Sequence, residues 1–183
     1  MKALFTFLTI IFLVGLSAQS INLEASKMEW TGKKITGQHN GTIQIAEANF
    51  GYEDGQLVSG TIVIDMTSIS CSDLSGEKAE SLVGHLKSAD FFDVVGFPEA
   101  ELSFNSVNQV EGNSYQLSGE LTIKGITEAI SFYANIGEKE ATTTLKIDRS
   151  KYDVRYGSTS FFDGLGDKAI DNIFEIKAKL VFQ

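Results

Sequence analysis

Apolar and polar residues alternate through most of this 183-residue chain. In the segment 115–124, for example, Leu117, Leu121 and Ile123 alternate with polar residues. Because successive side chains of a β-strand point to opposite faces, this spacing predicts strands with one buried and one solvated face. Such strands are typical of antiparallel sheets.

Eight segments carry this pattern, and short turns join most of them. They are 27–33, 42–52, 56–67, 99–109, 115–124, 126–136, 141–148 and 174–182. Long strands in an up-and-down order predict an all-β fold in which an eight-stranded antiparallel sheet closes into a barrel. A barrel of this size is either filled by its own side chains or holds one small ligand. A flat sandwich is the alternative fold.

Two segments depart from the alternation. Asn40-Gly41 is the dipeptide typical of hairpins, so 37–41 is predicted to be a turn or bulge. Residues 72–83 mix charged residues with Ala and Leu, which predicts a short helical insertion between strands 3 and 4. Asp73 or Ser75 is the expected N-cap of that helix.

The first twenty residues have the layout of a secretory signal peptide: one lysine, an apolar run and then small residues. The run 3–16 is short for a membrane span, although a retained anchor is the alternative. We therefore predict a signal peptide over 1–20 and one β-barrel domain over 21–183. The mature protein is expected to be periplasmic or extracellular, with no stable membrane insertion after cleavage.

Charge and cysteine content limit the partners and the chemistry. The net charge of -9 argues against nucleic acid and against anionic membrane surfaces as partners, because both require basic patches. Cys71 is the single cysteine, so the fold depends on packing without an internal disulfide.

Several motifs then occur in order along the chain. They are WTGK from Trp30, GQHNG from Gly37, GTIVIDM from Gly60, HLKSADFFDV from His85, Phe97-Pro98 and GELTIKGIT from Gly119. Together they resemble the YceI family of exported proteins over nearly all of the mature chain. The resemblance implies an eight-stranded antiparallel lipocalin-like barrel that holds a long apolar chain, such as a polyisoprenoid. It implies a binding role without catalytic residues, and a possible homodimer.

The predicted lipid contacts are inward-facing apolar residues and two phenylalanine pairs. They are Trp30, Ile62, Ile64, Phe91, Phe92, Phe104, Leu121, Ile123, Phe132, Leu145, Ile147, Phe161, Phe162, Phe174 and Ile176. We expect the two pairs to line the cavity entrance, and a permanent plug is the alternative. If these side chains instead fill the barrel, the protein is a non-enzymatic envelope stress or interaction protein.

The sequence contains little that indicates catalysis or cofactor chemistry. The chain has no nucleophile elbow, P-loop or dinucleotide fingerprint, so we expect no enzyme. His39 and His85 are the only histidines, and no metal-ligand spacing occurs. The expected ligand is a hydrophobic small molecule, an isoprenoid lipid or a quinone, with no cofactor. A polyprenyl phosphate would require a cation at the mouth, for which the candidates are Lys33, Lys34, Lys124, Arg149 and Arg155.

Overall fold

The computed structural model describes residues 17, 18 and 20–183, so the predicted signal peptide falls almost wholly outside the described residues. The strands are β1 (Ser17–Ala18), β2 (Lys27–Lys34), β3 (Gly37–Glu53), β4 (Gln56–Asp65), β5 (Glu99–Glu111), β6 (Ser114–Ile123), β7 (Ile126–Ile136), β8 (Glu140–Asp148) and β9 (Ile173–Val181). The helices are α1 (Glu77–Lys87) and the 3-10 turns η1 (Met66–Ser68), η2 (Arg149–Tyr152) and η3 (Gly166–Lys168). Among these described helices, none is long and apolar enough to cross a membrane.

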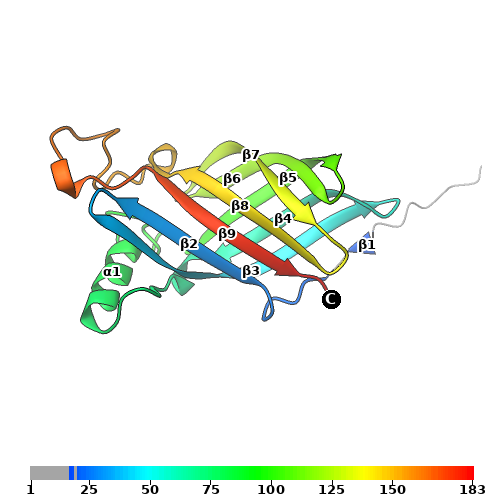
Figure 1. The fold of residues 1–183 in the computed structure, drawn as a ribbon, viewed down its shortest axis with the longest axis horizontal. Coiled ribbons are helices and arrows are strands. Elements are labelled where there is room, and N and C mark those ends of the chain that lie inside the picture. The colour runs from blue at the N-terminus through cyan, green and yellow to red at the C-terminus, as the bar shows by residue number, and fades with distance from the viewer. Residues whose placement is uncertain (1–16, 19) are drawn as a thin grey trace, which may run out of the picture.

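Eight of the described strands form a closed antiparallel barrel (Figure 1). Each strand from β2 to β9 pairs with the next in sequence, and β2 pairs with β9 to close the ring. The short β1 adds to the edge of β3. The prediction of an all-β, up-and-down barrel with a helical insertion between its third and fourth strands is confirmed.

The alternation observed in the sequence sets which side chains enter the barrel. On β7, Phe132 and Ala134 are buried, whereas Ser131, Tyr133 and Asn135 between them are exposed. The same pattern on the other strands builds one core of apolar side chains inside the ring. Burial of these faces is the main favourable contribution to folding, because the chain has no disulfide to support it.

The two ends of the barrel differ. Short turns at 54–55, 112–113 and 137–139 join strands at one end, which we call the hairpin end. At the other end, two long connections, 66–98 and 149–172, follow β4 and β8 (left in Figure 1). We call this the capped end, because side chains from both connections pack against the barrel core.

The predicted turn at 37–41 is wrong. The chain turns at 35–36, and Asn40-Gly41 lies within β3. The backbone of 70–72 runs along this part of β3, where Ser70 N donates to Thr42 O and Ser72 N donates to Asn40 O. A Cβ atom on Gly41 would lie 1.9 Å from Ser70 O. The glycine is therefore required by this close approach of backbone.

The helix begins later than predicted and has a different N-cap. It covers Glu77–Lys87, and Gly76 occupies the N-cap position with φ 58°. Asp73 is not available as a cap, because its carboxylate accepts from Asn40 N at 2.9 Å and pairs with His39 Nδ1 at 2.8 Å. Asp73 thereby fastens the start of the helical insertion to β3. His39 therefore acts as a hydrogen-bond partner of the helical insertion.

Candidate ligand-binding cavity

An apolar cavity of about 190 Å³ lies inside the barrel. Its lining runs from Met66, Leu86 and Phe91 at the capped end to Tyr52 and Phe182 at the hairpin end. Apart from the polar tips of Trp30 and Tyr52, the polar or charged lining residues are Thr142, Thr143, Arg149 and Asp171. The cavity is therefore suited to an apolar chain rather than to a polar substrate.

The volume indicates how much the cavity must change to admit a ligand. It exceeds the ~150 Å³ of a dry protein cavity that binds benzene. It is smaller than the ~300 Å³ at which ordinary ligand pockets begin. A long chain thus requires lining side chains to move apart. Met28 and Met66 in the lining are flexible enough to adapt.

Most of the predicted contact residues surround this one space. Those in the lining are Trp30, Ile62, Ile64, Phe91, Phe92, Phe104, Leu121, Ile123, Phe132, Leu145, Ile147, Phe174 and Ile176. The period-two pattern placed the strand residues correctly, because the inward face of every barrel strand meets the same interior. Their contact with a lipid remains a prediction.

Phe161 and Phe162 do not line the cavity, contrary to expectation. Their exposed fractions are 40% and 49%. Both backbone N–H groups donate to Ser158 O, at 3.2 and 3.1 Å, which forms a turn in the connection 149–172. The Arg155 guanidinium lies 5.1 Å from the centre of the Phe161 ring, on the outside of the molecule. This turn directs the pair away from the interior.

Phe91 and Phe92 close the capped end of the cavity from the connection 66–98. Phe91 N and Asp93 N both donate to Ser88 O, so the pair lies on a turn rather than on a strand. On a turn both rings can face inward. Phe91 is buried, its ring centre lies 4.9 Å from that of Phe92, and Phe92 in turn contacts Phe174 of β9.

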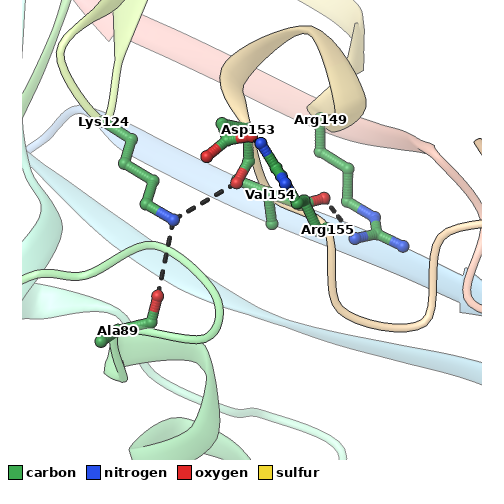
Figure 2. Close-up of polar contacts among 6 residues, drawn as sticks. All are labelled: Ala89, Lys124, Arg149, Asp153, Val154 and Arg155. Carbon is green, nitrogen blue, oxygen red and sulfur yellow. Dashed lines mark hydrogen bonds and ion pairs between the residues drawn. The ribbon is translucent and has the colours of Figure 1, made fainter. Parts of the chain in front are cut away.

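Lys124 connects the two long connections at this end (Figure 2). Its Nζ donates to Ala89 O at 3.5 Å and to Asp153 O at 3.3 Å. Lys124 and Gly125 form the two-residue β6–β7 turn, and both have positive φ. The tight turn holds the lysine at the rim of the barrel, within reach of both connections.

His85 makes a second contact between the connections. Its ring lies edge-on to Phe91 and to Tyr156, with centres 5.5 and 4.3 Å apart. Its Nε2 is buried and, among the described residues, has no hydrogen-bond partner. The contact is therefore held by ring packing rather than by a hydrogen bond from this nitrogen.

Arg149 is the buried cation of the site, with an exposed fraction of 2%. Its Nε donates to Asp171 O, Nη1 donates to Val154 O and Tyr156 O, and Nη2 donates to Ile170 O, over 2.8 to 3.1 Å. Desolvation by burial lowers the pKa of Arg149, while the charges of Asp148 and Asp171 raise it. This side chain holds the connection 149–172 in shape and also lines the cavity.

Sequence reasoning missed four lining residues that the long connections supply, because these segments carry no period-two signal. They are Ile69, Leu86, Ile170 and Asp171. It also omitted three lining residues near the hairpin end, Phe50, Tyr52 and Leu57. The alternation of Phe50 with Tyr52 was a usable signal for two of them. Burial raises the pKa of Tyr52.

Solved structures with the same fold support this description. BcnA from Burkholderia cenocepacia is similar with a TM-score of 0.71 and 23% identity, covering 88% of this chain and 99% of that one. A polyisoprenoid-binding domain from Saccharophagus degradans is similar with a TM-score of 0.63 and 12% identity, covering 92% of this chain and 99% of that one. At these identities the likeness establishes the barrel fold.

Sequence relatives point to the same group of proteins. The chain is 27% identical to UPF0312 proteins of Pseudomonas putida over 121 residues, which is 60% of this chain and 61% of theirs. The alignment thus spans less than two thirds of those relatives. The sequence model of the YceI-like domain, in contrast, matches residues 19–182. The resemblance found in the motifs is confirmed, and this chain belongs to the YceI-like domain family.

Proposed function

We propose that this protein binds a long-chain amphiphile, a polyisoprenoid or quinone-like lipid, inside its barrel, and carries or stores it after export. The observation that carries the proposal is the apolar cavity that runs between the two ends of the barrel. Burial of a few hundred Å² of prenyl chain contributes on the order of 10 kcal/mol before the cost of association. Such a gain suffices for stable retention of a lipid.

The relatives are consistent with this proposal. The barrel from Saccharophagus degradans is described as a polyisoprenoid-binding domain, and it has the same fold as this chain. The nearly uniform apolar lining favours binding over catalysis, since general acid–base chemistry requires placed polar groups. The alternative of a filled barrel is disfavoured by the space that remains inside.

Retention of tritiated geranylgeraniol through gel filtration tests the proposal. Ala134→Phe fills the cavity from β7, and Ala129→Phe places the same side chain on the outer face of the same strand. Overpacking of about 1–3 kcal/mol predicts a loss of retention of roughly fivefold or more for the first variant. The second variant should retain the prenol like the unmodified protein.

Retention is counted per folded molecule, with folding followed by circular dichroism, so that destabilisation is not mistaken for lost binding. The proposal is rejected if the unmodified protein retains no prenol. It is equally rejected if both variants retain as much as the unmodified protein, because the prenol then binds outside the cavity.

A further inference from the structure

We infer that the cavity selects amphiphiles with an anionic polar end, a phosphate or a carboxylate, and that this end lies against Arg149 at the capped end. The inference rests on the proposed function and adds the chemical class of the ligand's head. In this arrangement the apolar tail extends along the barrel toward Tyr52 and Phe182 at the hairpin end.

Arg149 carries a positive charge inside the protein. A guanidinium stays protonated in proteins, and this one is 2% exposed while it lines an apolar cavity. Within the described part of the chain, no carboxylate oxygen lies within 4.0 Å of it. Its acceptors are four backbone carbonyl groups. They occupy four of its five N–H groups but leave its positive charge without a paired anion.

The surroundings of the Arg149 guanidinium are mostly apolar. The Phe91 ring lies 5.4 Å from its Cζ, and apolar side chains make up most of the remaining lining. Electrostatic attraction is stronger in such surroundings than in water, because the effective dielectric is lower. An anionic oxygen reaching the remaining N–H would make a charge-assisted hydrogen bond there. A cationic head would be repelled.

Two acidic residues lie near Arg149 and weaken its field. The Asp148 carboxylate accepts from Ser150 N at 3.0 Å and Ser150 Oγ at 2.6 Å. The Asp171 carboxylate accepts from Ile173 N at 2.9 Å, and Asp171 is exposed, so water and salt screen its charge. Arg149 is the more deeply buried charge, so its field acts on the interior with less screening.

The other cations proposed from the sequence do not fill this role. Lys33 and Lys34 are exposed at the end of β2, and Arg155 pairs with Asp153 on the surface. Lys124 uses its ammonium group between Ala89 O and Asp153 O (Figure 2). Of the five candidates, Arg149 is the one that lines the cavity.

A head-group series on the unmodified protein tests the inference. Dodecyl phosphate, dodecanol and dodecylammonium share one tail and differ in charge, and each is titrated below its aggregation limit. Trp30 is the single tryptophan and lines the cavity, so its fluorescence reports entry. We expect the phosphate to bind about tenfold tighter than the alcohol, as one charge-assisted hydrogen bond predicts, and the ammonium to bind weakest.

The overall charge of the protein acts against this result. A chain with a net charge of -9 repels anions at long range, so a preference for the phosphate cannot come from its general field. Equal binding of phosphate and alcohol, or tighter binding of the ammonium, overturns the head-group inference and leaves the proposed function intact. If none of the three probes binds, the proposed function itself fails.

Substitutions of Arg149 and Arg155 test whether Arg149 causes the preference for the phosphate. Arg149→Met should abolish the phosphate preference with dodecanol binding retained, and Arg149→Lys should keep part of the preference. Arg155→Met is the matched control on the surface of the same connection and should keep all of it. Loss of the preference in Arg155→Met would contradict the inference. If Arg149→Met does not fold, the probe series on the unmodified protein still decides the question.

Discussion

Gly41 lies where the backbone of 70–72 runs along β3, and this close approach leaves no space for a side chain. A Cβ atom there would meet the Ser70 backbone at 1.9 Å. We expect Gly41→Ala to lower the free energy of unfolding by about 3 kcal/mol, at the upper end of overpacking effects. Urea unfolding followed by circular dichroism measures this loss.

Gly84 supplies the matched control for that substitution. It lies within α1, and a Cβ atom there would meet nothing within 4 Å. Gly84→Ala should raise the free energy of unfolding by about 1 kcal/mol, because alanine is the better helix former. If the two alanine variants have equal stability, the backbone at Ser70 does not approach Gly41 as closely as described.

Asp73 gives the barrel a dependence on pH in the acid range. Its hydrogen bond from Asn40 N, with those from His39 and Cys71, lowers its pKa from 3.8 to about 2. A lowered pKa means that the ionised carboxylate stabilises the folded state. This contribution is complete above about pH 4 and is lost as the pH falls through the folded value of about 2.

The comparison of the unmodified protein with Asp73→Asn tests this dependence. The difference in their free energies of unfolding should stay constant above pH 4 and disappear toward pH 2. Acid destabilisation at other carboxylates affects both proteins alike, so it cancels in the difference. A difference that is unchanged from pH 5 to pH 2 contradicts the role assigned to Asp73.

The sequence predicted the roles of individual residues only in part. Asn40-Gly41 has the composition of a hairpin turn, but its glycine serves a long-range contact with Ser70 that no local pattern reveals. Asp73 likewise has the composition of a helix cap, while its carboxylate binds β3 instead. Both errors have the same cause. Each residue contacts a segment that is distant in sequence, and the local pattern does not show that contact.

The capped end is built from two connections that few polar contacts join. Lys124 donates to one carbonyl in each of them. We expect Lys124→Met to lower the free energy of unfolding by no more than about 2 kcal/mol, the usual net worth of two hydrogen bonds. We expect it to loosen the turn that carries Phe91, so that bound prenol is released faster.

Hydrogen exchange measures that local loosening. The amides of Phe91 and Asp93, both bonded to Ser88 O, should exchange faster in Lys124→Met, and amides of β6 and β7 should not. Lys146→Met, at an exposed position on β8, is the control. Unchanged exchange at Phe91 and Asp93, together with an unchanged release rate, would show that Lys124 does not hold the capped end.

The sequence predicted those secondary structure elements in which apolar residues recur at a regular spacing. All eight barrel strands were predicted, because their inward faces must be apolar along the whole barrel. Helix α1 was placed too early, because Asp73 and Ser75 resemble N-caps whereas the actual N-cap is the glycine Gly76. The outward direction of Phe161 and Phe162 depends on a turn at Ser158, which the sequence does not mark.

At the scale of the whole molecule, strand number and order indicated closure, but they did not distinguish an open interior from a filled one. That difference depends on how side chains from opposite strands meet. In the structure the interior contains a cavity of about 190 Å³, and Arg149 is among the residues that line it. A homodimer and the exported location remain predictions from the sequence.

Native mass spectrometry of the mature protein, purified without detergent from the cells that make it, shows whether the barrel carries a lipid. We expect one extra lipid-soluble mass per chain, released on denaturation and carrying an acidic head group. A bare polypeptide mass that remains bare after incubation with polyprenols, polyprenyl phosphates and quinones would contradict this expectation.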